Sequence, residues 1–203
     1  MENQEFIEDF LGGVTQIIDN LSRSDISDVV DVLYKAWQEG RRIFIIGNGG
    51  SASTASHFAS DLNKMTIVPN QPRVRAVSLV DNIPWISALT NDEGWDNIYV
   101  EQLKNLYQHG DVIIGISVHG GSGSDNAGLW SQNLLKATKY VKDNGGVTIG
   151  FSGFDGGALK QQADVCIVVP YDTASHVESL HVTLHHMVTS CLAEKIRATP
   201  VSS

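Results

Sequence analysis

Five short apolar segments, each followed by a stretch with helical character, limit how this chain can fold. The apolar segments fall at residues 43–46, 73–79, 112–116, 147–151 and 165–169. Such alternation is typical of a parallel sheet with helices on both faces. The chain has 203 residues, enough for one domain of this kind with a sizeable core. We therefore expect an α/β fold, a three-layer α/β/α sandwich around a five-stranded parallel sheet, with residues 1–203 as a single domain.

Two amphipathic stretches precede the first apolar segment. Apolar residues recur at helical spacing over residues 4–21, and a second helix is expected between the capping residues Ser24 and Asp25 and a stop at Gly40. One face of a sheet does not need both helices. Residues 1–40 are therefore predicted to be a helical extension that packs either against other subunits or within the chain.

A glycine-rich turn follows the first apolar segment. It reads Gly47-Asn48-Gly49-Gly50, and a helix is expected to open at Ser51. Glycines let the backbone approach a ligand closely, and the N-terminus of a helix favours an anion. The turn is thus a candidate cradle for an anionic group.

Three interpretations compete for this turn. Gly47-x-Gly49-x-x-Ala52 fits a dinucleotide fingerprint, but the acidic residue expected about 20 positions later is missing. Asp61 comes too early for that role and Asp81 too late. A tight turn without any ligand is the second interpretation. The third, a phosphorylated or otherwise polar small ligand, is the one we favour.

A second loop of similar chemistry, residues 117–124, follows the third apolar segment with the sequence SVHGGSGS. Its hydroxyls and flexible backbone amides can form a concavity that binds an anion, although a solvated loop is the alternative. In open parallel sheets, ligands bind at the carboxyl ends of the strands, where both loops are expected. No Gly-Lys-Ser/Thr pattern is present, which argues against nucleoside triphosphate hydrolysis.

Acid–base and metal-binding side chains gather on two predicted helices. His57 and Asp61 lie four residues apart, and so on one helical face. The last helix carries His176, Glu178, His181, His185 and His186 within eleven residues. Imidazoles and carboxylates at such spacing can bind zinc or a similar metal. Some of these histidines are alternatively hydrogen-bonded core residues or contacts between subunits.

Composition narrows the classes of partner. The net charge of −9 argues against nucleic acid as the main partner, since a nucleic-acid groove needs a basic stripe. We expect no membrane segment, because no apolar run is long enough to span a bilayer. The only cysteines, Cys166 and Cys191, lie in apolar segments and predict reduced core thiols. With an acidic N-terminus unlike a signal peptide, these features predict a cytoplasmic protein.

With these pieces placed, the chain resembles the sugar isomerase (SIS) domain family, most closely its phosphoheptose isomerase branch. The most specific segments are GNGGSASTASHFASDL, LTNDEGWDN, GDVIIGIS, GFSGFDGGAL and VESLHVTLHH, and the resemblance extends from the leading helices to Arg197. It implies a flavodoxin-like sheet. It also implies the interconversion of sedoheptulose 7-phosphate and D-glycero-D-manno-heptose 7-phosphate through an enediol. Members of this branch are homo-oligomers, typically tetramers, with active sites between subunits, and some bind zinc.

The resemblance assigns roles to individual residues. Asp61 matches the family's glutamate base, and His186 matches a histidine that serves as acid–base and metal ligand; helical spacing from Glu178 alone would favour His185 instead. The expected metal ligands are His57, Asp61, Glu178 and His186. Together with the two loops, the resemblance gives a set of candidate substrate-binding residues: Asn48, Gly49, Gly50, Ser51, Asp92, Ser117, His119, Gly120, Ser122 and Glu178.

This sequence departs from the family pattern in three places. The base is the shorter aspartate, and Glu178 replaces a glutamine, which makes the set more suitable for a divalent metal. The phosphate loop carries about nine additional residues, so the family's last phosphate-binding serine corresponds to Ser122, Ser124 or Ser131. The sequence does not choose among the three, and the insertion leaves the exact sugar open.

Two other functions remain as alternatives. Some relatives are non-catalytic modules that bind proteins or sense sugar phosphates, but those tend to lack the acid–base residues that this chain keeps. An NAD-dependent oxidoreductase rests on the glycine pattern alone.

Helix geometry also predicts a site shared between subunits. Asp61 lies roughly 15 Å along the helix from Ser51, too far for one phosphosugar to reach both comfortably. We therefore expect the Ser117 loop to hold the phosphate and Asp61 to serve a pocket that another chain completes.

Overall fold

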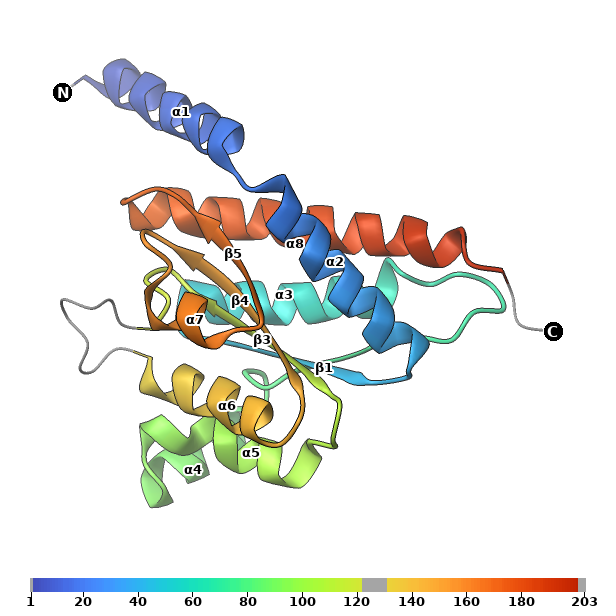
Figure 1. Ribbon diagram of the computed structural model, residues 1–203. Helices are drawn as coiled ribbons and strands as arrows, with labels where there is room; N and C mark the ends of the chain where they lie inside the picture. The colour runs from blue at the N-terminus through green and yellow to red at the C-terminus, as the bar shows by residue number, and fades with distance from the viewer. Residues whose placement is uncertain (1, 122–130, 201–203) are drawn as a thin grey trace.

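Five parallel strands form the centre of the computed structural model, in the spatial order β2-β1-β3-β4-β5 (Figure 1). The structure describes residues 2–121 and 131–200. The strands are β1 (Arg42–Gly47), β2 (Arg75–Ser78), β3 (Val112–Ser117), β4 (Val147–Gly153) and β5 (Val165–Val169). This is the flavodoxin-like order, whose switch point lies between β1 and β3. The predicted five-stranded parallel sheet is confirmed.

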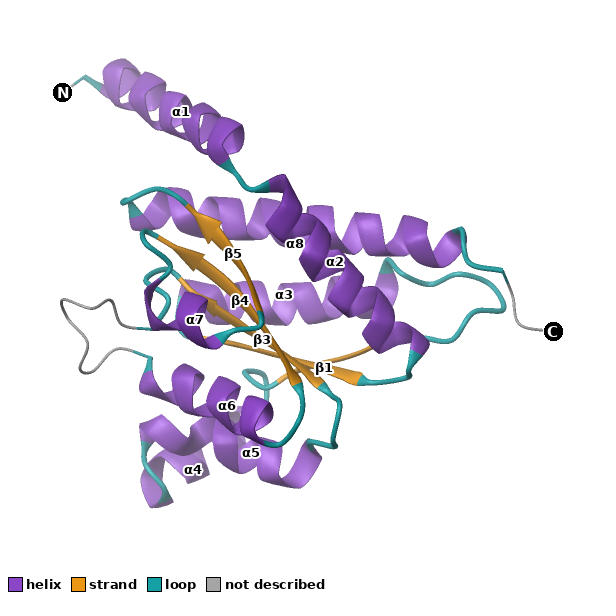
Figure 2. Ribbon diagram, in the orientation of Figure 1, coloured by secondary structure: helices purple, strands orange, loops and turns teal. Residues whose placement is uncertain are grey.

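Helices cover both faces of the sheet (Figure 2). They are α1 (Asn3–Asn20), α2 (Arg23–Gln38), α3 (Gly50–Lys64), α4 (Ile83–Asp92), α5 (Ile98–Leu106), α6 (Gln132–Asp143), α7 (Gly157–Gln162) and α8 (Ala174–Arg197), with a 3₁₀ turn at Trp95–Asn97. α2, α3 and α8 pack on one face, and α5, α6 and α7 on the other. The predicted three layers are therefore present.

Side chains of β1 alternate between the two cores. Ile43 and Ile45 join the core under α2, α3 and α8, whereas Phe44 and Ile46 join the core under α5 and α6. All four are fully buried. Successive residues of a strand point to opposite faces, so a central strand must be apolar throughout. This requirement explains why the strands read as continuous apolar runs.

The first helix, α1, projects away from the body of the protein (Figure 1). Its anchor is His176 at the start of α8, whose ring stacks on Phe10 at a centroid distance of 4.0 Å and whose Nε2 lies 3.0 Å from the Phe10 carbonyl oxygen. A side chain at Gly13 would meet the Tyr171 hydroxyl at 2.6 Å, so only glycine permits this approach. The exposed apolar residues of α1 are Phe6, Ile7, Leu11 and Ile18.

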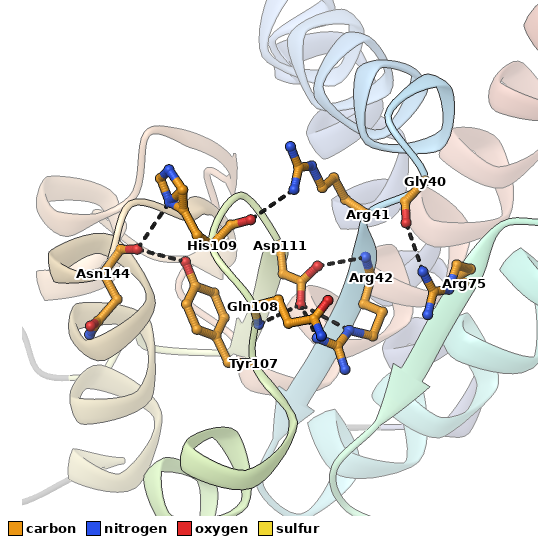
Figure 3. Close-up of polar contacts among 9 residues, drawn as sticks. All are labelled: Gly40, Arg41, Arg42, Arg75, Tyr107, Gln108, His109, Asp111 and Asn144. Carbon is orange, nitrogen blue, oxygen red and sulfur yellow. Dashed lines mark hydrogen bonds and ion pairs between the residues drawn. The ribbon is translucent and has the colours of Figure 1, made fainter.

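A buried carboxylate organises the amino-terminal edge of the sheet, opposite the switch-point loops (Figure 3). Asp111 is 2% exposed and accepts hydrogen bonds from the backbone N–H of Arg42, the Nε of Arg42 and the backbone N–H of Gln108. Another nitrogen of the Arg42 guanidinium lies 2.9 Å from the same carboxylate. The charge is therefore paired and hydrogen-bonded, as a buried charge requires. This contact fastens the start of β1 to the start of β3.

The structure corrects several local expectations. Ser22, rather than Ser24 or Asp25, caps α2 by accepting from the backbone N–H of Asp25. Cys166 is half-buried, but Cys191 is exposed, so the expectation of a core thiol was wrong there. The periodicity of α8 places Cys191 outside the apolar stripe that packs on the sheet. Across the described part of the chain, no helix combines the length and apolar character needed to cross a membrane.

His181 is a core residue of α8. It is 1% exposed, and its Nε2 lies 3.1 Å from the Ser152 carbonyl oxygen. That oxygen can only accept, so Nε2 carries the proton. Burial lowers the pKa of His181 to about 4. One of the alternatives that the sequence left open, a hydrogen-bonded core histidine, therefore describes His181.

Titration of His181 predicts a pH-dependent stability. The unfolded state takes up the proton near pH 6.5 and the folded state only near pH 4, so stability falls as the pH drops through this window. One pKa unit corresponds to about 1.4 kcal/mol, which makes the loss roughly 3 kcal/mol for this residue. Urea denaturation of His181→Gln should therefore show a shallower decline between pH 6.5 and 4. The exposed His109→Gln is the control and should keep the wild-type decline. Identical pH profiles for His181→Gln and wild type would contradict this assignment.

Candidate active site

The turn between β1 and α3 is possible only with glycine at two positions. A Cβ on Gly47 would lie 2.5 Å from the Ser51 carbonyl oxygen, which no side chain tolerates. Gly49 has φ 56° and ψ −124°, a conformation that residues with a Cβ rarely adopt. The chain therefore reverses sharply, and α3 begins at the carboxyl edge of the sheet.

A cavity of about 150 Å³ lies where this turn meets the loop after β3. Hydroxyl, amide and imidazole groups gather around it, and its lining residues are Asn48, Ser51, Ile116, Ser117, Val118, His119, Gly121, Ser131 and Glu178. The Ser117 hydroxyl accepts from the backbone N–H of Gly121, which folds the loop back over the end of β3. The two loops thus meet at the switch point, as the sequence predicted.

Among the described residues that line this cavity, Glu178 contributes the only carboxylate. It comes from α8 and lies against the N-terminus of α3, where a Cβ on Gly50 would be 2.7 Å from its Oε1. The amino-terminal end of a helix favours negative charge, which stabilises the carboxylate at this position. One anion, supplied by the chain itself, therefore already occupies the end of α3.

Four side chains form a second polar centre farther along α3. One potential ligand atom each from His57, Asp61, His185 and His186 lie within 4.8 Å of one another. Oδ2 of Asp61 is 3.3 Å from Nε2 of His186, 3.5 Å from Nε2 of His57 and 3.7 Å from Nδ1 of His185. Two helices that are far apart in the sequence, α3 and α8, thus bring a carboxylate and three imidazoles together.

Burial differs sharply within this cluster. His185 is fully buried, whereas the side chains of His57 and His186 are 49% and 45% exposed. Burial, together with the neighbouring His186 and His57, lowers the pKa of His185 to about 4. His185 is therefore neutral near pH 7, the form in which an imidazole can bind a metal.

The cluster fits a divalent cation. Oδ2 of Asp61 and both ring nitrogens of His185 are buried, and among the described residues none of them has a hydrogen-bond partner. Buried polar atoms are normally satisfied, so these atoms require a partner that the described residues do not supply. Imidazole nitrogens with one carboxylate are a ligand set typical of zinc.

A second, wider cavity of about 540 Å³ runs along the exposed face of α3. It is lined by Ala52, Ser53, Ser56, His57, Ser60, Val80 and Asp81. His57 belongs both to this lining and to the cluster, so the cluster is reached from this side of α3.

The structure brings together most, but not all, of the predicted site. His57, Asp61 and His186 meet as expected, whereas Glu178 lies outside the cluster because it is eight residues before His186, about 12 Å along the helix axis. His185, which helical spacing had favoured over His186, takes its place beside Asp61. Both histidines are therefore members of the cluster.

The candidate substrate-binding residues divide in the same way. Asn48, Ser51, Ser117, His119 and Glu178 line the smaller cavity. Gly49 and Gly120 belong to the two loops beside it, and Gly50 is the first residue of α3. Ser131 also lines it, while Ser122 and Ser124 lie outside the described residues.

Asp92 lines neither cavity. It is exposed at the end of α4, where it accepts a hydrogen bond from the Asn91 side chain. Sequence reasoning missed Tyr99 and Asn133, which hydrogen-bond to the glycine turn. Both sit at ordinary helical positions, and nothing in their spacing distinguishes them.

Comparison with known proteins gives consistent matches. The model of the SIS domain family matches residues 5–153. A lincomycin biosynthesis protein of Streptomyces lincolnensis is 44% identical over 80% of this chain, which spans 58% of that relative's length. A probable phosphoheptose isomerase of Thermoplasma acidophilum is 33% identical, covering 87% of this chain and 91% of the relative. The structure of a phosphoheptose isomerase from Neisseria gonorrhoeae superposes with a TM-score of 0.81 at 24% identity, covering 94% of this chain and 96% of that one.

Proposed function

This chain belongs to the SIS domain family, and we propose that it is an aldose–ketose isomerase acting on a phosphorylated sugar. The proposed substrate is sedoheptulose 7-phosphate, and the product is D-glycero-D-manno-heptose 7-phosphate. The observation that carries this proposal is the position of the Asp61 carboxylate. It is held among three imidazoles from α3 and α8, and it lies on α3, the helix whose amino-terminal end borders a polar cavity. Relatives that are named phosphoheptose isomerases support the choice of sugar.

The reaction moves a proton between two neighbouring carbons. A ketose becomes an aldose when a base removes a proton beside the carbonyl and returns it one carbon over, through an enediol. We assign this step to the Asp61 carboxylate. His186, 3.3 Å from Oδ2 of Asp61 and half exposed, is placed to move the hydroxyl protons.

The smaller cavity suits the phosphate group. Hydroxyls of Ser117 and Ser131 and the amide of Asn48 line it, and neutral donors of this kind hold a phosphate without a basic side chain. Holding the phosphate fixes the distance at which the reacting carbons meet the base, which lowers the entropic part of the barrier.

A divalent metal, zinc in our proposal, would be held by His57, Asp61, His185 and His186. When bound, it would polarise the substrate carbonyl and stabilise the developing oxyanion. The chain's own contribution is to keep His185 neutral by burial and to present Asp61 from the opposite helix.

The proposed base gives a direct prediction. Asp61→Asn keeps the shape of the side chain but removes its basicity, so turnover of sedoheptulose 7-phosphate should fall by about 10²- to 10⁴-fold. Aldose formation measured by chromatography checks this, with the exposed Asp143→Asn as a matched control that keeps wild-type activity. Full activity of Asp61→Asn would remove Asp61 from the role of base. Absence of turnover by the wild type would favour the alternative, a non-catalytic sugar-phosphate-binding or protein-binding regulator.

The metal proposal has its own test. Protein purified without chelator should carry about one zinc ion per chain by elemental analysis, because the four ligands suit that ion. His57→Gln should weaken zinc binding at least tenfold, since even outer-shell changes cost 10- to 100-fold. His181→Gln, on the same helix as His185 but outside the cluster, should leave zinc affinity unchanged. If metal-free protein keeps full activity in chelator, the reaction does not need a metal, and the cluster acts only through acid–base chemistry.

We further propose that the protein is a homotetramer whose active sites lie between subunits. The larger cavity along α3 is open to solvent on one side, and Asp92 is presented away from both cavities. The exposed apolar residues of α1 give the helical extension of residues 1–40 a surface to bury against another copy, and closed symmetry is the usual outcome. In this arrangement the Ser117 loop of one chain holds the phosphate of the substrate, and the reacting carbons of that substrate lie at Asp61 of another chain.

Subunit mixing tests the shared site. Asp61→Asn and Ser117→Ala proteins, each impaired alone, should regain activity after subunit exchange, because random mixing leaves about a quarter of the sites with both native groups. Asp61→Asn mixed with His186→Ala is the negative control, since these two residues lie in one chain. Verified exchange without recovery in the first pair would contradict a shared site.

A further inference from the structure

A reciprocal pair of amides joins the glycine turn to the start of α6. The Nδ2 of Asn48 donates to Oδ1 of Asn133, and the Nδ2 of Asn133 donates to Oδ1 of Asn48, both at 3.0 Å. Asn133 is fully buried, and its Oδ1 also accepts from the backbone N–H of Leu134. The orientation of the Asn48 amide is therefore fixed by a partner that cannot itself reach solvent.

A buried tyrosine holds the same turn from α5. The Tyr99 hydroxyl donates to the Gly47 carbonyl at 2.5 Å and lies 3.4 Å from Oδ1 of Asn48. Burial raises the pKa of Tyr99 to about 12, so the hydroxyl keeps its proton throughout the physiological range. α5 and α6 pack against each other, and both deliver a polar group to one side of the turn.

These contacts link the two walls of the smaller cavity. Asn48 also donates to the hydroxyl of Ser131, and both of these residues line the cavity. Tyr99 and Asn133 are not among the lining residues. They act on the cavity only through Asn48 and Gly47. By fixing these two residues they restrain Gly49, which lies between Asn48 and α3; an unrestrained glycine would sample many backbone conformations besides the one seen here.

We propose that Tyr99 and Asn133 are positioning residues for the substrate. They hold the Gly47–Gly50 turn and the Asn48 amide in the binding conformation, so that no ordering of this loop is needed when the anionic end of the ligand arrives. This inference rests on the proposed function for the identity of the ligand. The arrangement of the turn itself stands on the hydrogen bonds alone.

Tyr99→Phe tests the proposal by removing one hydroxyl and little volume. Amide hydrogen exchange at residues 47–50 should become faster, and the KM for sedoheptulose 7-phosphate should rise about two- to tenfold, the range for one lost hydrogen bond, with kcat nearly unchanged. Tyr34→Phe is the matched control: it also loses one hydroxyl contact, to Thr199 at 2.7 Å, but on α2 and outside the cavity lining. It should change neither exchange at the turn nor KM.

A second pair of variants tests the proposal independently, in case Tyr99→Phe fails to fold. Asn133→Ala should reproduce the exchange and KM changes, whereas Thr138→Val, which alters another buried polar residue of α6, should not. Unchanged exchange at residues 47–50 in both test variants overturns the proposal, as does faster exchange with wild-type KM. If the wild type does not turn over the sugar, the proposed function fails, and the exchange measurement alone then decides whether Tyr99 and Asn133 hold the turn.

Discussion

The packing of α8 against α3 is the contact on which the candidate site depends. Ala55, Ala59 and Phe58 of α3 share one core with Leu180 and Leu184 of α8, and the small alanines let the helix backbones approach closely. The Phe58 ring lies against the His185 ring at a centroid distance of 5.3 Å. Because this apolar seam sets the register between the helices, His185 and His186 arrive beside Asp61 without a loop to position them. A site built on two packed helices holds its geometry more tightly than one built on loops.

The difference between local patterns and contacts between distant helices explains what could be predicted from the sequence. The five strands and their helices follow from apolar periodicity, and the glycine turn follows from a local steric requirement that is visible in its residues. Helical spacing alone put His57 and Asp61 on one face of a helix. The pairing of Asp61 with His186 required the family resemblance, because contacts between distant helices leave no periodic signal. Helical spacing pointed to His185 and the motif to His186, and both were informative. The positions of Glu178, Tyr99 and Asn133 depend on tertiary packing, which a single sequence does not encode in any local pattern.

Glu178 lines the smaller cavity, and its charge bears on how a ligand lies there. Its carboxylate lies at the amino-terminal end of α3, the place where sequence reasoning had put a bound anion. Two negative charges about 5 Å apart repel by roughly 1 kcal/mol even in water, so a phosphate is better placed toward Ser117 and Ser131. The sugar hydroxyls would then face Glu178, which can accept hydrogen bonds from them as the neutral glutamine of the family pattern also could. Under the proposed function, the charge of Glu178 would therefore orient the substrate within the cavity.

In the proposed mechanism, Asp61 moves a proton between two neighbouring carbons through an enediol. Isomerisation of sedoheptulose 7-phosphate in D₂O, followed by nuclear magnetic resonance of the aldose product, tests it most directly. A base that exchanges its proton with solvent should place deuterium at C2 of the aldose, at least in part of the product. Aldose that forms at the normal rate with only hydrogen at C2 would show that the transferred hydrogen never exchanges with solvent, which would contradict a solvent-exchanging base at Asp61.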